Sequence, residues 1–136
     1  STDNYFVAVR RRNHFGVTTA SSVPLSSSSV LIDFTSPATS TFGTNASKTT
    51  GSVKVCWAGN VVRNANIQYT GANNDRDPIL VRVGSSLPTN TVSGYYAEDV
   101  TLDGIVQYTG AGNDRDPILV NVGGSTPNNQ ITEQIP

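Results

Sequence analysis

The sequence predicts an all-β protein, a β-sandwich of about 8–10 short strands with an N-terminal strand extension. Three observations carry this prediction. Gly, Pro and Asn interrupt the chain every ~8–12 residues, which is the spacing of turns between short strands. No window of ~11 residues has apolar side chains at helical spacing. One segment also occurs twice in nearly identical form, which indicates tandem structural units.

The repeated segment reads QYTGANNDRDPILVRV at 68–83 and QYTGAGNDRDPILVNV at 107–122. The two copies differ at two of these positions and are offset by 39 residues. The match continues weakly upstream, so the tandem units cover 53–91 and 92–130. Because a solenoid generally needs about three repeats, we expect either pseudo-symmetric halves of one domain or two equivalent surfaces.

Each copy is interpreted as a β-hairpin, in which a turn rich in Asn, Asp and Pro joins two strands. In the second strand of the first copy, Ile79, Val81 and Val83 would share one face. The polar tail after the second copy has one apolar side chain, Ile131, that could dock. The ten expected strands are 4–10, 15–19, 29–35, 52–57, 60–63, 66–70, 78–83, 93–97, 100–108 and 117–122. Together they would form an immunoglobulin-like or jelly-roll-like sandwich over residues 14–136.

The N-terminal segment 1–13 is expected to be an arm. Its apolar stretch is either an edge strand of the chain's own sheet or a strand donated to a neighbouring copy by β-augmentation. The residues of this candidate donor strand are Tyr5, Phe6, Val7, Ala8 and Val9.

Serine and threonine make up half of residues 17–52. Such Ser/Thr-rich stretches with proline are typical acceptors of O-glycans, and Asn45-Ala46-Ser47 is an N-glycosylation sequon. A flexible loop around one strand is the alternative. The candidate glycosylation sites are Asn45, Ser26, Ser27, Ser28, Thr39 and Thr41.

Composition excludes several classes of function. The net charge of -1 gives no electrostatic support for binding nucleic acid, and no apolar segment is long enough to span a membrane. The chain begins at Ser1, which suits a processed secreted protein, and Cys56 is the only cysteine. We therefore expect an extracellular or cell-surface location.

The motif Asn-Asp-Arg-Asp-Pro at 74–78 and 113–117 has the oxygen donors that calcium prefers. Its spacing does not fit an EF-hand loop, and a structural turn with no ion is the alternative. Calcium is the one cofactor that the sequence suggests. The candidate calcium ligands are Asp75, Asp77, Asp114 and Asp116.

No pattern for catalysis is found, and we expect a protein that is not an enzyme. The single histidine, His14, has no nucleophile motif to accompany it. Trp57 and the pair Tyr95-Tyr96 are candidates for stacking on a sugar, with a core or cross-strand aromatic pair as the alternative.

The apolar segment Tyr5–Val9 and the Ser/Thr-rich stretch 17–52 resemble the layout of extracellular pilus subunits. This resemblance implies a secreted, glycosylated β domain that donates its N-terminal strand to the next copy in a helical filament. The chain lacks the paired cysteines of chaperone-assisted pilins, which favours another filament type. We therefore expect a structural, adhesive homopolymer. The alternatives are a carbohydrate- or calcium-binding module and a small viral coat or fibre protein.

Overall fold

The computed structural model describes residues 3–136, which form two compact units. The first unit contains the described residues up to Arg11, residues 15–57 and residues 133–136. The second contains residues 12–14 and 58–132. The chain is β-rich, with 28% strand and 12% helix. The predicted β-rich class is therefore confirmed, although two helices make "all-β" too narrow.

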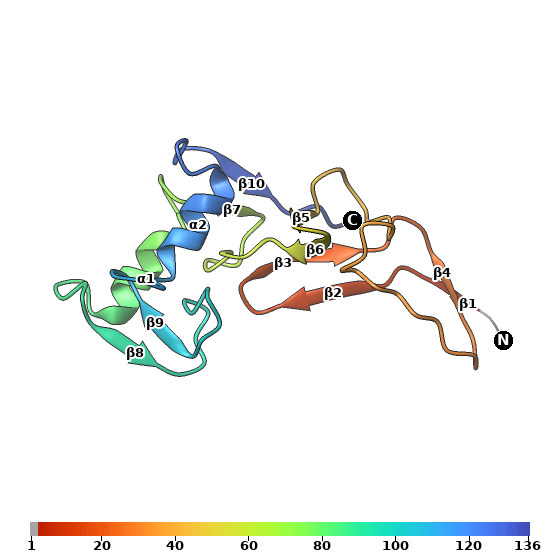
Figure 1. Ribbon diagram of the computed structural model, residues 1–136, viewed down its shortest axis with the longest axis horizontal. Helices are drawn as coiled ribbons and strands as arrows, with labels where there is room; N and C mark the ends of the chain where they lie inside the picture. The colour runs from red at the N-terminus through yellow and green to blue at the C-terminus, as the bar shows by residue number, and fades with distance from the viewer. Residues whose placement is uncertain (1–2) are drawn as a thin grey trace. The chain divides into compact units, whose positions relative to one another are not determined.

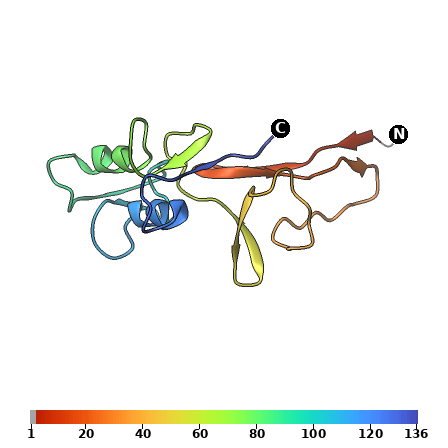
Figure 2. The same ribbon diagram turned by 90° about the horizontal axis from the view of Figure 1, so that it is seen from above.

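Three two-stranded sheets account for the strands of the first unit (Figure 1). The expected strand 4–10 is divided into two strands in the structure. The expected strands 15–19 and 52–57 are confirmed. The sheets pair β1 (Asp3–Tyr5) with β4 (Val23–Leu25), β2 (Ala8–Arg11) with β3 (His14–Thr18), and β5 (Ser47–Thr50) with β6 (Val53–Cys56). Figure 2 shows the same sheets from above.

The apolar core of the first unit consists of Phe15, Val17 and Ala46. The expected strand 29–35 is wrong, because this segment has no strand and ends in a turn. The Asp33 carboxylate accepts the backbone amide of Thr35 at 2.9 Å, a local bond that competes with a strand ladder.

The second unit contains both copies of the repeated segment, each as a short strand followed by a helix (Figure 1). The expected strand 66–70 is confirmed. Of the expected strand 100–108, only the second half is a strand, and no strand forms at 60–63. The helices are α1 (Arg76–Val83) and α2 (Arg115–Val122), and the paired strands are β7 (Asn66–Gln68) with β10 (Gln130–Thr132), and β8 (Thr91–Ser93) with β9 (Ile105–Gln107).

The expected strands 78–83 and 117–122 are wrong, because both segments are helical. Asn74 begins α1 by accepting the amide of Asp77 through its side-chain oxygen at 2.9 Å. Pro78 is tolerated in the first turn, where no intrahelical amide donor is needed. Gly84 ends the helix in a left-handed conformation with φ 103°. The second copy repeats this pattern, so the motif starts a helix rather than a hairpin.

The core of the second unit is duplicated. Helix α1 packs on β8 and β9, while α2 packs on β7 and β10, so each helix covers a strand of the other copy. Ile131 is buried in β10, which confirms its expected docking. Because each helix covers a strand of the other copy, two repeats are enough to form a core. The equivalent buried pairs are Val61/Val100, Ile67/Val106, Ile79/Ile118 and Val83/Val122.

Two alanine substitutions distinguish the helix from the strand expected at 78–83. Ile79 is fully buried, whereas Val81 is 67% exposed on the same helix. Ile79→Ala should lower the free energy of unfolding by about 2–5 kcal/mol, and Val81→Ala by about 0.5 kcal/mol or less. Urea denaturation measures both. Equal losses would indicate a strand with both side chains on one buried face.

Candidate functional site

Asp75 and Asp114 occupy equivalent positions, directly before α1 and α2, and both are fully buried. Each carboxylate bonds to backbone amides of the residues that precede it. Asp75 accepts the amides of Val62 and Gln68, both at 2.9 Å. These bonds close residues 60–75 into a loop, named loop 1, and residues 99–114 into an equivalent loop, named loop 2.

The Asp114 carboxylate is bonded in the same way within loop 2. It accepts the amides of Val100 at 2.7 Å, Thr101 at 2.9 Å and Gln107 at 2.8 Å. The hydroxyl of Thr101 also donates to it at 3.1 Å. Burial raises the pKa of Asp114, and it raises the pKa of Asp75 to about 6, although the amide bonds act in the opposite direction.

The two aspartates of each Asn-Asp-Arg-Asp motif do not share surroundings. Asp77 lies on the outer side of the first turn of α1, where Asn74 donates to it at 2.8 Å and Arg76 pairs with it at 2.8 Å. Asp116 has the same partners in the second copy. The four predicted calcium ligands are therefore divided between buried loops and exposed helix turns.

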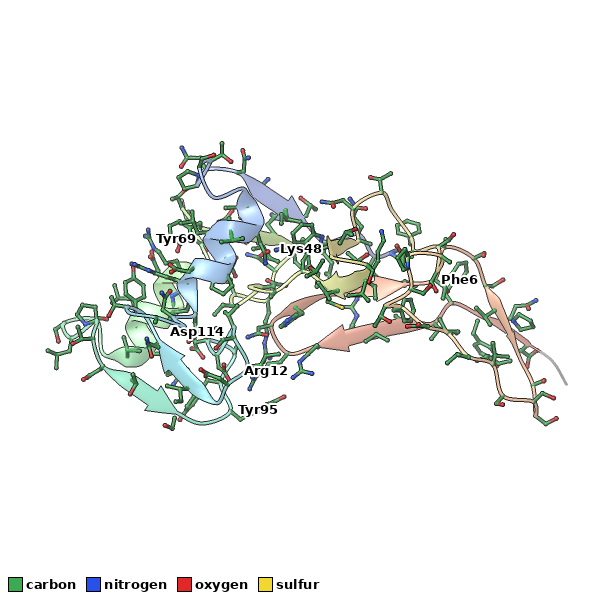
Figure 3. All side chains as sticks on the ribbon, in the orientation of Figure 1. Phe6, Arg12, Lys48, Tyr69, Tyr95 and Asp114 are labelled. Carbon is green, nitrogen blue, oxygen red and sulfur yellow. The ribbon has the colours of Figure 1, made fainter. Side chains whose placement is uncertain are left out.

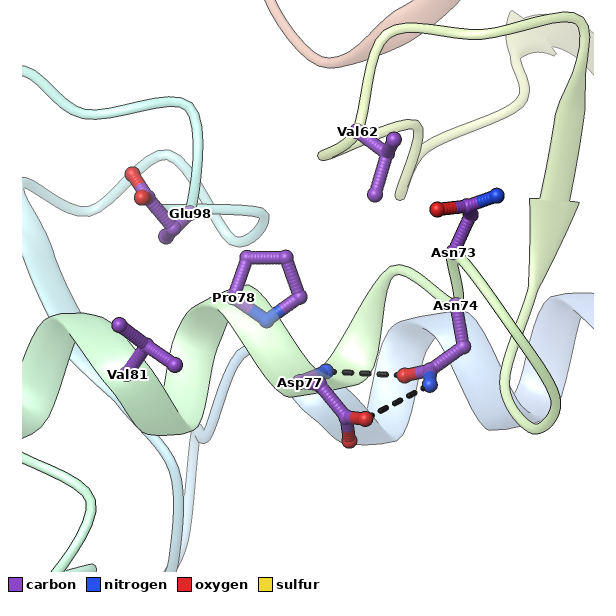
Figure 4. Close-up of a pocket in the computed structure, with 7 residues that line it drawn as sticks. All are labelled: Val62, Asn73, Asn74, Asp77, Pro78, Val81 and Glu98. Atoms are coloured by element: carbon purple, nitrogen blue, oxygen red, sulfur yellow. Dashed lines mark hydrogen bonds between the residues drawn. The ribbon is translucent and has the colours of Figure 1, made fainter.

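Asp77 lines an open pocket of about 410 Å³ (Figure 4). Asn74 bonds to Asp77 at one end of this pocket, and Glu98 lies at the other, where Arg82 pairs with it at 3.0 Å. Both carboxylates therefore already have cationic partners, Asp77 through Arg76. The lining residues are Val62, Asn73, Asn74, Asp77, Pro78, Val81 and Glu98.

Loop 1 satisfies its polar groups with neutral side chains. Asn60 donates to the Asn64 carbonyl at 2.8 Å and accepts the Asn64 amide at 3.1 Å. The position between them is Val62, which has no side-chain oxygen. Asp75 is the one acidic residue in loop 1.

Loop 2 has carboxylates where loop 1 has amides. Asp99 replaces Asn60 and Asp103 replaces Asn64, while Thr101 replaces Val62. The Asp99 carboxylate accepts the amides of Asp103 at 3.2 Å and Gly104 at 3.1 Å, and Thr101 lies 3.5 Å from it. Thr101 thus contacts both buried carboxylates, and loop 2 gathers charge where loop 1 is neutral.

Arg12 supplies a positive charge next to loop 2. Its guanidinium donates to Asp99 at 3.2 Å and lies 3.8 Å from the centre of the Tyr95 ring. The neighbouring Asn13 donates to the carbonyls of Ala97 and Asp99 at 2.8 and 2.6 Å. Figure 3 labels Arg12, Tyr95 and Asp114.

The donors of loop 2 are of the kind that bind calcium or magnesium. Counted from Asp99, Thr101 is third, Asp103 fifth and Gly104 sixth, which matches the start of an EF-hand loop. Asp114 is sixteenth rather than twelfth, and the fold brings it to Thr101. Among residues 3–136, no three His, Cys, Asp or Glu side chains form a ready-made metal group. In this structure Asp99 faces Arg12, and Asp103 accepts the amide of Ile105 at 2.8 Å.

The other predicted site residues lie outside these loops. Asn45 and Ser26 to Ser28 are exposed, while Thr39 and Thr41 are half-buried. Tyr5 pairs with Val23 in the β1–β4 sheet, and the Val7 carbonyl accepts the Thr19 amide at 3.0 Å. The candidate donor strand thus makes backbone bonds within its own chain.

The candidate sugar platforms are partly covered by cations. Arg12 lies over Tyr95, and Arg82 lies 4.4 Å from the ring centre of Tyr96. Lys48 lies 5.8 Å from the ring centre of Trp57, whose indole donates to the Asn45 carbonyl.

Sequence reasoning selected Asp114 but missed Asp99, Asp103 and Arg12. The signal for the first two was the 39-residue offset itself, which aligns them with Asn60 and Asn64. A switch from amide to carboxylate at two aligned positions distinguishes a charged loop from a neutral one. Nothing in the sequence pairs Arg12 with Asp99, because 87 residues separate them.

No protein-family model, curated protein or solved structure in the comparisons matches this chain. Neither helix within residues 3–136 has the length and hydrophobicity to cross a membrane.

The buried Asp75 predicts an unusual pH dependence. Its folded-state pKa of about 6 lies above the ordinary value of 3.8, so its protonation favours folding. This contribution is full below pH 3.8 and is lost as the pH rises through about 6. Asp75→Asn should therefore cost less stability at about pH 7.5 than at about pH 3.5. Urea denaturation at the two pH values measures the difference.

Asp77→Asn is the matched control. Hydrogen bonds from Asn74 and Arg76 lower the pKa of Asp77, so its contribution is present above the ordinary value and lost as the pH falls. Its substitution should cost more at the higher pH. The same pH trend in both variants would contradict the burial of Asp75.

Proposed function

We propose that the chain is a calcium-binding β-rich module in which loop 2 holds the ion. The observation that supports this most is the contrast between the loops: the closing aspartate accepts backbone amides in both, while Asn60 and Asn64 of loop 1 are replaced by Asp99 and Asp103 in loop 2. Buried carboxylates need compensation by a positive charge. Asp99 and Asp103 are not gathered around Asp114 in this structure, so they would have to turn toward it and the Thr101 hydroxyl to hold calcium, whose coordination is oxygen-rich and flexible.

Calcium would supply positive charge and cross-link the start of the loop to the start of α2. The chain's own residues do the rest. The Gly104 backbone, at φ +88°, turns the loop so that its amide reaches Asp99. The amides that bond to Asp114 keep its carboxylate pointing into the loop. Loop 1 lacks these charges and serves as a structural copy.

The test is a calorimetric titration of the full chain with calcium. We expect one site, and a rise in the free energy of unfolding of about 2.7 kcal/mol when calcium is at a hundred times its dissociation constant. Asp99→Asn and Asp114→Asn should each weaken binding by about tenfold or more, because each removes a carboxylate donor.

Asp116→Asn is the matched control, since it removes the same charge from the same motif outside loop 2, and it should leave binding unchanged. No heat of binding, with no thermal stabilisation, would refute the calcium proposal. Binding lost with Asp116→Asn rather than with Asp114→Asn would place the ion at the helix turn instead.

We propose, as a second function, that copies of the chain associate through the first unit into an extracellular filament. The supporting observation is the surface of this unit, which buries three apolar side chains and leaves more of them exposed. Exposed apolar side chains that gather into a patch mark interaction sites, and the described part of this unit leaves nine large ones exposed. The exposed residues are Tyr5, Phe6, Val9, Leu25, Val30, Leu31, Phe42, Val53 and Val55.

Association would pair the open edges of β1–β4 and its neighbours between copies, so a sandwich would form between subunits. Donation of the 5–9 segment would exchange its bonds to Val23 and Thr19 for the same bonds in the next copy. Glycans on the exposed Asn45 and Ser26–Ser28 would cover the surface that remains outside the contact.

Point substitutions at exposed apolar side chains of the first unit test this function. Phe6 is 60% and Leu31 is 91% exposed. The double variant Phe6→Ser, Leu31→Ser should raise the concentration needed for self-association by about tenfold or more, because each side chain contributes roughly 1.5–3 kcal/mol when buried.

Sedimentation velocity over a concentration series measures the association. Leu87→Ser, at a 56% exposed leucine of the second unit, is the control and should change nothing. A wild-type chain that remains monomeric at millimolar concentration would refute the filament proposal.

A further inference from the structure

The pocket beside α1 combines apolar and polar walls (Figure 4). Pro78 and Val81 of α1 supply apolar surface, and Val81 is 67% exposed. Asn73 and Glu98 lie on opposite sides of Pro78. The pocket lies within the second unit, and its volume of about 410 Å³ falls in the range of roughly 300–1,000 Å³ that is typical of small-ligand sites. Its size and mixed lining are those of a binding site for a small polar molecule.

The two copies of the repeated 16-residue segment differ at two positions, and both positions serve this pocket. Asn73 lines the pocket, where the second copy has Gly112. Arg82 holds Glu98 by an ion pair of 3.0 Å, where the second copy has Asn121. The differences between otherwise identical segments therefore fall on the polar walls of one pocket.

The side chain of Glu98 also has no counterpart on the equivalent surface of α2. The 39-residue offset aligns Glu98 with Gly59. Gly59 lies against α2, since a Cβ atom placed on it would be 2.8 Å from Cγ1 of Ile118. The surface of α2 thus has glycines, Gly59 and Gly112, where the pocket of α1 has Glu98 and Asn73. These two polar walls belong to the first copy.

Asn73 offers a hydrogen-bonding group that the fold does not use. Its backbone has φ +58°, in the left-handed region, and the equivalent Gly112 has φ +74°. Asparagine enters this region more readily than most residues with a side chain. The side chain of Asn73 is exposed, and its amide makes no hydrogen bond within the part of the chain that the structure describes. The amide can therefore both donate and accept hydrogen bonds at the rim of the pocket.

The two carboxylates of the pocket can accept hydrogen bonds without carrying uncompensated charge. Asp77 pairs with Arg76 at 2.8 Å, and Glu98 pairs with Arg82 at 3.0 Å. A carboxylate has about four acceptor sites, so both retain capacity for further donors. A cationic ligand would find both charges already neutralised, whereas hydroxyl groups can donate to them. The pocket thus favours a neutral ligand that is rich in hydroxyl groups.

We propose that this pocket binds a neutral saccharide. The hydroxyl groups of the sugar donate to Asp77 and Glu98 and exchange hydrogen bonds with the Asn73 amide. The C–H groups of the sugar pack on Pro78 and Val81. This site goes beyond the calcium and filament functions and depends on neither of them.

The experiment begins with the fluorescently labelled full chain, in calcium-free buffer, on a glycan array of neutral hexoses, N-acetylhexosamines and charged uronic acids. We expect binding to neutral glycans. The neutral glycan that binds best is then titrated into the ¹⁵N-labelled chain, with putrescine in a parallel titration as the cationic probe. The amide signals of Asn73, Asp77 and Val81 should shift with the glycan and stay in place with putrescine.

Three variants test the location of the site. Asn73→Gly restores the residue of the second copy, which suits the positive φ, and should weaken glycan binding about fivefold or more because the hydrogen bonds of the amide are lost. Val81→Gln places a longer polar side chain in the pocket and should weaken binding at least as much. Val120→Gln, at the equivalent position of α2, which is 61% exposed, is the matched control and should bind as the wild type does. Glutamine is a better helix former than valine, so both helix variants should fold.

Four results would overturn parts or all of this inference. Absence of binding to every neutral glycan overturns it entirely, and shifts with putrescine alone assign the pocket to cations instead. Equal affinities of the wild type and Val81→Gln, or equal losses in Val81→Gln and Val120→Gln, place the sugar outside the pocket. Wild-type affinity in Asn73→Gly overturns the role of the amide. All four leave the calcium proposal standing, because the buffer contains no calcium.

Discussion

The second unit depends on one buried carboxylate at the start of each helix. Asp75 and Asp114 tie the helix to the strand that precedes it, through amides of the loop between them. This bond positions the helix so that it covers a strand of the other copy. Desolvation of the carboxylate opposes the arrangement, as the raised pKa of Asp75 shows, and the amide bonds compensate for it in part. The fold of the unit follows from repeating this one interaction.

The two copies share this geometry but differ in charge. Loop 1 satisfies itself with Asn60 and Asn64, and so it needs no ion. Loop 2 keeps the backbone bonds and replaces the two amides by carboxylates, so that a positive charge is required. In the structure the Arg12 guanidinium pairs with Asp99 at 3.2 Å, while two of its nitrogen atoms are buried without partners among residues 3–136. The duplicated scaffold thus carries one neutral and one acidic loop, on which the calcium proposal rests, while the proposed association rests on the exposed apolar side chains of the first unit.

Sequence reasoning found the repeat and several of the strands, because both depend on local sequence pattern. It missed the helices because Ile79 and Val83 lie on one face in both a strand and a helix. The signals that separate the two were present: Pro78 in a first turn and Gly84 at the end. For the site, sequence reasoning selected Asp114 but paired it with Asp116, its neighbour in the motif. The side chain that bonds to it, Thr101, lies 13 residues earlier in the chain, and the fold brings the two together.

The most direct test of the calcium account is a nuclear magnetic resonance titration of the ¹⁵N-labelled full chain with calcium. The account predicts that the amide signals of Gly104 and other residues of loop 2 shift, together with the side chain of Arg12, while the equivalent amides of loop 1 stay in place. Equal shifts in both loops, or no shift in either, would contradict the claim that the change from amide to carboxylate creates the site.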